Sequence, residues 1–242
     1  MKDHIEQFIA ALNFAWGELF DFPLQMIFKG QKKLDQNNEF TLAAFPFLGF
    51  LLGLIVAFSS FLMAVIFNHQ AGGLFFAVIG WLVLCFKDSG RGDVWFGKYC
   101  CSLLQKHSDS TLSVTVLTVF PVLLKFLLLL FIGIAGGFFY LPVLLGAAFA
   151  VQAALASCED CPVAFIPYGS EGEKYFKIAM VVLALIGFAG CSMATLGATV
   201  AAILIYFHFR KRMCDSGFTA GAISNAGYFA EWILLAVGLL LV

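Results

Sequence analysis

Basic residues occur in every second loop between long apolar runs, and this constrains the fold more than any other feature of the chain. Of the fourteen Lys and Arg residues, all except Lys125 lie before the first apolar run, after the second, after the fourth or after the sixth. The short loops around residues 68–72, 136–137 and 191–193 carry no Lys or Arg. Basic residues concentrate in the cytoplasmic loops of membrane proteins. The pattern predicts a multi-pass membrane protein, with its charged loops facing the cytoplasm.

The composition supports this prediction. Hydrophobic residues make up 62% of the chain and charged residues 12%, whereas a soluble domain carries about 25% charged residues. The net charge of −1 gives no basic field that would attract nucleic acid. The apolar composition instead makes membrane lipid the expected surroundings of the protein. Cys158 and Cys161 form a CxxC motif, but no second pair or nearby His completes a zinc site.

The apolar runs predict an all-α bundle in one integral-membrane domain, residues 1–242. No strand-like alternation occurs, and a membrane helix needs about 20 apolar residues, so we expect about six or seven transmembrane helices. The expected spans are 41–67, 71–86, 112–134, 137–157, two within 178–209 that turn near 187–192, and a last one from about 221 or 229 to 242. Residues 1–40 form a cytoplasmic or interfacial segment before the bundle at 41–242.

Two local patterns refine this expectation. Apolar residues recur at helical spacing over about residues 4–20 with polar residues between them, which predicts an amphipathic N-terminal helix lying in the membrane interface. Gly49 and Gly53 have the small-xxx-small spacing that lets two helices approach closely. We interpret this glycine pair as a packing feature rather than a ligand site.

The loop 86–98 is the strongest candidate for chemistry. Asp88 and Asp93 are hard oxygen ligands of the kind that Mg²⁺ uses when it also holds phosphate. Glycines let a backbone approach a ligand closely, and Lys and Arg neutralise phosphate oxygens. The glycines are Gly90, Gly92 and Gly97, and the basic residues are Lys87, Arg91 and Lys98. An ordinary solvated cytoplasmic loop explains the same composition equally well.

Two further segments offer weaker candidates. Asp109 and Ser110 precede the third expected span, where they could join the same site or simply cap a helix. Ser216 and Gly217 follow the basic cluster at residues 210–212, in a glycine-rich stretch that could hold phosphate at a helix start. Basic residues after a span are also the usual topology anchor, so both interpretations of this cluster stay open.

Lys125 and Glu231 are ionisable residues at membrane depth, where charge is costly and a functional role is the default hypothesis. Lys125 lies four residues after Pro121, where it could reach a carbonyl freed by the proline or a carboxylate. Glu231 lies nearer to a helix end in the sequence pattern, from which its side chain could extend toward water.

Several motifs, in order along the chain, resemble those of the cobalamin synthase family, which comprises adenosylcobinamide-GDP ribazoletransferases. Phe45–Gly53 resembles the family's first-span pattern, and the stretch 89–97 lies where the family has an Asp-Gly-x-Ala-Asp-x-x-Asp-Gly motif. Asp109-Ser110 resembles its Asp-Ser-Arg segment, Lys125 its intramembrane Lys, and Tyr168–Gly172 its Tyr-x-x-x-Gly loop. Ser216-Gly217 with Gly221-Ala222 resembles the pattern before its final span.

The resemblance implies a transferase that joins adenosylcobinamide-GDP to α-ribazole or its 5′-phosphate and releases GMP, late in cobalamin biosynthesis. It implies Mg²⁺ held by Asp93, Asp88 and Asp109, and a catalytic set of Asp93, Asp88 and Lys125. The implied substrate-binding residues are Ser89, Gly90, Arg91, Gly97, Ser110, Ser216 and Gly217. A corrinoid nucleotide, a ribazole and other corrinoid-assembly proteins are the implied partners.

The chain also departs from the family pattern at acidic positions. Ser89 and Phe96 stand where the first motif has Asp, Phe218 stands for the Asp of the last motif, and Asn225 for a carboxylate early in the last helix. A second hypothesis is therefore a catalytically impaired relative that acts as a membrane scaffold or corrinoid-binding partner. A third is a small membrane transporter in which Lys125 and Glu231 line the pathway.

Overall fold

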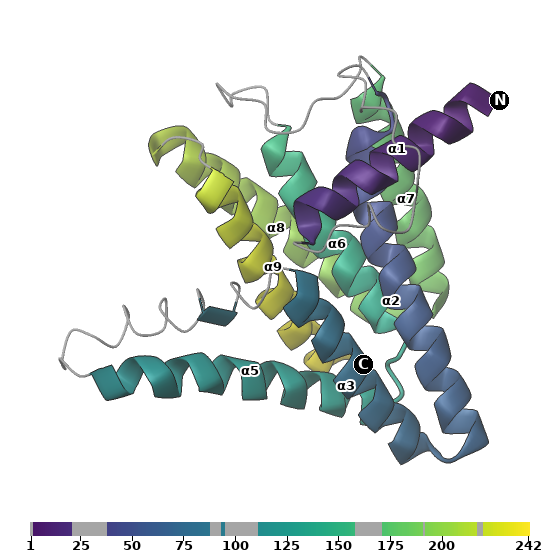
Figure 1. Ribbon diagram of the computed structural model, residues 1–242, viewed down its shortest axis with the longest axis vertical. Coiled ribbons are helices and arrows are strands. Elements are labelled where there is room, and N and C mark those ends of the chain that lie inside the picture. Colours follow the sequence, from purple (N-terminus) through teal and green to yellow (C-terminus); the bar gives the residue numbers. More distant parts are fainter. Residues whose placement is uncertain are drawn as a thin grey trace.

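The computed structural model describes residues 2–20, 38–87, 93–94, 111–157, 171–190, 192–216 and 220–242. Within these ranges the chain is helical and contains no strand, which confirms the all-α prediction for the described part. The helices are α1 (Lys2–Leu19), α2 (Thr41–Ile66), α3 (His69–Lys87), α5 (Thr111–Ile134), α6 (Tyr140–Ala156), α7 (Gly172–Gly190), α8 (Ser192–Ser216) and α9 (Ala220–Leu241). Figure 1 shows α5 extending sideways from the other helices.

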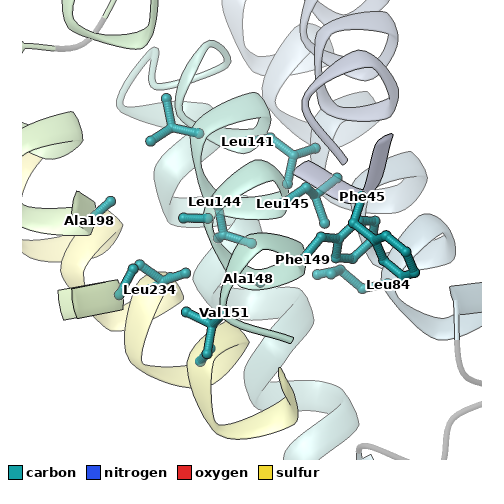
Figure 2. Close-up of a cluster of buried hydrophobic side chains, with 14 of the residues drawn as sticks. Phe45, Leu84, Leu141, Leu144, Leu145, Ala148, Phe149, Val151, Ala198 and Leu234 are labelled. Carbon is teal, nitrogen blue, oxygen red and sulfur yellow. The ribbon is translucent and has the colours of Figure 1, made fainter. Parts of the chain in front are cut away.

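Helix α6 is the centre of the bundle. It packs against α2, α7, α8 and α9, and nearly every one of its residues is buried. Its small and branched side chains face neighbours on all sides, so a helix that is apolar around its whole circumference is accommodated inside protein. Figure 2 shows Leu144, Leu145 and Phe149 of α6 within this core, with Phe45 and Leu84 near Phe149.

The glycine pair on α2 packs directly on α6. A Cβ atom at Gly49 would lie 2.6 Å from the Leu145 carbonyl oxygen, and one at Gly53 would lie 2.5 Å from the Pro142 Cα atom. Real Cβ atoms do not approach backbone so closely, so these two backbones touch only because both positions are glycine. The predicted packing role of the pair is confirmed.

Three helices are long and apolar enough to cross a membrane within the described residues: Thr41–Ile66, Met193–Asp215 and Gly221–Leu241. This is fewer than the expected six or seven. The apolar helical stretches His69–Cys85, Val119–Ile134 and Tyr140–Ala156 are shorter, and 17 residues of α6 rise only about 26 Å against a hydrocarbon core of ~30 Å. The predicted spans 71–86 and 112–134 lie wholly within α3 and α5, and of the first four only the span 137–157 passes its helix, α6, by more than one residue.

Two further predictions concern the long apolar run 178–209 and the N-terminal helix. The long run 178–209 is divided as expected, because α7 ends at Gly190 and α8 begins at Ser192. The expected N-terminal helix is α1, which packs against α2 and places Phe8 against Phe47 with ring centroids 5.3 Å apart. Ile5 and Ile9 of α1 stay exposed, so one side of α1 presents apolar side chains outward.

Candidate functional site

Four ionisable side chains from distant parts of the chain meet inside the bundle. Lys87 ends α3, Asp93 lies in the short described segment 93–94, Lys125 lies in α5, and Glu231 lies in the middle of α9. We call these four residues the ion cluster. Each is at most 3% exposed, so the bundle has withdrawn two ammonium groups and two carboxylates from solvent.

Each residue of the ion cluster contacts another, so the four side chains form one continuous network. Lys125 Nζ lies 2.5 Å from Asp93 Oδ1 and 3.9 Å from Glu231 Oε2. Lys87 Nζ donates a hydrogen bond to the other carboxylate oxygen, Glu231 Oε1. Among the described residues, none donates a hydrogen bond of normal geometry to Asp93 Oδ1, and the charge of Lys125 lies against this oxygen. If all four groups are ionised, the two positive and two negative charges balance.

Aromatic rings and one thiol surround the ion cluster. Lys87 Nζ lies 5.2 Å from the ring centroid of Phe149 and 5.5 Å from that of Tyr228. Lys125 Nζ lies 5.3 Å from the ring centroid of Trp232. The negative faces of such rings attract cations. The Cys85 thiol lies 3.8 Å from Asp93 Oδ2 and can donate a weak hydrogen bond to it.

The structure places two of the predicted site residues side by side. Asp93 and Lys125, which the sequence located 32 positions apart, form the direct ion pair described above. Ser216 is the last residue of α8. The other predicted site residues, Asp88, Ser89, Gly90, Arg91, Gly97, Asp109, Ser110 and Gly217, lie outside the described residues, and their roles stay predictions.

Glu231 differs from its sequence interpretation. It does not extend toward water from a helix end, because it is 1% exposed and is held by both lysines of the ion cluster. The signal that would have found this pairing is the occurrence of opposite charges at membrane depth on separate apolar helices, where an unpaired charge is costly. The aromatic neighbours Phe149, Tyr228 and Trp232 carried no comparable signal, since they look like ordinary core residues.

The described carboxylates do not by themselves form a magnesium site. No group of three or more His, Cys, Asp or Glu side chains comes together within the described ranges, and Asp93 and Glu231 are already engaged by ammonium groups. Mg²⁺ usually binds through one or two protein carboxylates together with substrate phosphate. Two of the three predicted magnesium ligands, Asp88 and Asp109, lie outside the part of the chain that the structure describes, so the magnesium site at Asp93, Asp88 and Asp109 stays a prediction.

Comparisons of the chain with protein-family models, with curated proteins and with solved structures found no match.

Proposed function

We propose that this chain is a membrane-embedded transferase of the cobalamin synthase type, acting on a corrinoid nucleotide at the ion cluster. The observation that supports this proposal most is the pairing of Asp93 with Lys125. These are the acidic and the basic residue that the motif resemblance assigns to catalysis, and they come from separate elements of the fold.

The reaction would form one phosphorus–oxygen bond and break another. A hydroxyl oxygen of the ribazole attacks the phosphorus attached to cobinamide, the bond from that phosphorus to the bridging oxygen breaks, and GMP leaves. Such transfers depend mainly on positioning and on stabilising negative charge. A pyrophosphate brings negative charge that competes with Asp93 and Glu231 for the ammonium groups of Lys125 and Lys87.

Competition for the lysines gives the acids and the lysines of the ion cluster separate roles in the reaction. When phosphate oxygens take over the contact with Lys125, the Asp93 carboxylate is released from its ion pair and can face the attacking hydroxyl. It is then suited to receive the proton of the attacking hydroxyl as a general base. Lys125 and Lys87 meanwhile stabilise the charge that develops on the phosphoryl oxygens and the leaving group. Mg²⁺ held through Asp88 and Asp109 remains part of the proposal and would supply further charge neutralisation.

A second candidate function rests on the same contacts. Both described carboxylates are neutralised by lysines, and several acids of the family motifs are replaced, as at Ser89 and Phe96. A cluster of this kind could hold the helices together in a relative that binds a corrinoid without transferring the nucleotide. We place the protein in a bacterial inner membrane in either case, with the shorter apolar helices completing the membrane domain.

An assay of GMP release separates the two candidates. The purified protein in detergent is given adenosylcobinamide-GDP, α-ribazole and Mg²⁺, and GMP is measured by chromatography. We expect turnover by the wild type and a loss of about 10²–10³ in kcat for Asp93→Asn, the magnitude typical of removing one group that handles transition-state charge. Glu171→Gln, at an exposed pair beside the start of α7, is the control and should match the wild type.

Two results would count against the transferase. If the folded wild type releases no GMP while binding the corrinoid, the non-catalytic candidate is correct. If Asp93→Asn releases GMP at the wild-type rate, the reaction takes place elsewhere in the chain. Corrinoid binding is followed by the absorbance of the corrin ring on the protein after gel filtration, so that a failure to bind and a failure to react are told apart.

A further inference from the structure

A cavity of about 820 Å³ lies between α7 and the helices α2, α6 and α8. Its walls come from α2, α6, α7 and α8, and none of the four residues of the ion cluster lines it. Phe149, the α6 residue that contacts Lys87, is also absent from its walls. The cavity is therefore a separate site on another face of α6.

The cavity exists because α7 packs loosely. Only two residues of α7, Gly172 and Gly187, are buried in the bundle. Larger side chains on the inner side of α7, such as Phe176 and Met180, line the cavity and remain partly exposed. Protein interiors contain few voids larger than a water molecule, so a hollow of this size with apolar walls is suited to hold an apolar molecule.

The cavity has one charged end and a long apolar body. Ser157, Glu173, Lys177 and Arg210 line it where α6 and α8 end and α7 begins. Other lining residues continue along α6 back to Pro142 and along α8 back to Thr195. These positions lie about 22 Å from the charged end at 1.5 Å per residue, which exceeds the ~15 Å of hydrocarbon in one bilayer leaflet. The site matches an amphiphile with one full-length tail.

We propose that the cavity binds an acyl chain of an anionic phospholipid, with the lipid phosphate beside Arg210 and Lys177. Two basic residues face one acid at the charged end, where Glu173 lies 2.6 Å from Lys177. Lys211 and Arg212 follow on α8, where Asp215 is the one acid of the last two turns, so basic side chains outnumber acidic ones among the described residues at this end. One wall of the cavity belongs to α8, which is long and apolar enough to cross a membrane, so the cavity would lie next to bilayer lipid. The positive end then selects an anionic head group over a zwitterionic one.

The test measures phospholipid retained by the full-length protein. Wild type is purified in mild detergent, washed, exchanged against an equal mixture of phosphatidylglycerol and phosphatidylcholine, and extracted for mass spectrometry. We expect about one phosphatidylglycerol per chain to resist washing. Ala184→Trp fills the cavity from α7 and should lower retention roughly tenfold, whereas Ala189→Trp, on an exposed position of the same helix that does not line the cavity, should retain wild-type levels.

Two further variants test the cavity and the head-group contact separately. Ala147→Phe fills the cavity from α6, so the result does not depend on one substitution folding, and thermal melting in detergent confirms that each variant is folded. Arg210→Gln should abolish the preference for phosphatidylglycerol over phosphatidylcholine. The proposal is overturned if wild type retains no lipid, if the filled and control variants retain equal amounts, or if Arg210→Gln leaves the head-group preference unchanged.

Discussion

Two groups of ion pairs in this protein have the same chemistry in opposite surroundings. The ion cluster joins two lysines and two acids inside the bundle, where each residue is at most 3% exposed. At the start of α7, two other lysines and two other acids form the pairs Glu171–Lys174 at 2.9 Å and Glu173–Lys177 at 2.6 Å. These four side chains are between 48% and 70% exposed.

The difference lies in what each charge would do without its partner. On the surface of α7, water solvates an unpaired lysine or glutamate, so an exposed pair contributes at most about 1 kcal/mol. Inside the bundle no water replaces the lost partner, and breaking one buried pair costs about 3–5 kcal/mol. The buried lysines of the ion cluster therefore matter to stability mainly because their removal would leave Asp93 or Glu231 as an uncompensated charge.

Lys125→Met gives the largest expected effect. The change keeps most of the apolar volume of the side chain but removes the cation that contacts both Asp93 and Glu231. We expect the free energy of unfolding to fall by about 3–5 kcal/mol, measured by denaturant titration in detergent. A loss below about 1 kcal/mol would show that water reaches the ion cluster, and the contrast with α7 would then disappear.

A double substitution tests whether the loss comes from the unpaired charge or from lost packing. Lys87→Met should destabilise the protein because it removes the hydrogen-bond donor of Glu231 Oε1, and Glu231→Leu should destabilise it because it leaves Lys87 unbalanced. Both changes together remove the pair without leaving either charge, and we expect the double variant to recover most of the loss. Additive losses in the double variant would instead assign the cost to packing.

The sequence allowed much of the fold to be predicted, because lipid exposure leaves a strong mark on composition. The apolar runs, the division of the run 178–209 into two helices, and the close helix packing at Gly49 and Gly53 follow from hydropathy and residue size alone. That α6 is the partner of these glycines does not. The number of membrane-crossing helices was harder to predict from the sequence. An apolar run does not tell whether its residues face lipid or, as for most of α6, other helices.

The candidate site was predictable only in part. Lys125 could be recognised, because a lysine inside an apolar helix needs a partner. The sequence left open whether that partner is a freed carbonyl or a carboxylate, and the structure shows the carboxylate of Asp93. Opposite charges at membrane depth suggest that Glu231 pairs with a lysine, but its hydrogen bond with Lys87 could not be predicted, since it joins α9 to the end of α3 over 144 residues. Local spacing along a chain carries no information about such a contact.

The smallest expected effect is at the exposed pairs, and it is visible in a pKa rather than in stability. Glu171 accepts a hydrogen bond from Lys174 and raises the pKa of that lysine above its usual value of 10.5. A raised lysine pKa favours folding below the unfolded pKa, and the contribution is lost as pH rises through the folded value. The contribution is thus present at pH 7, but it is small because the pair is exposed to water. Glu171→Gln should leave the unfolding midpoint at pH 7 within error of the wild type, while the pKa of Lys174, followed by NMR of its side chain, moves down. A measurable loss of stability at pH 7, comparable to that of Lys125→Met, would mean that burial is not what separates the two groups of ion pairs.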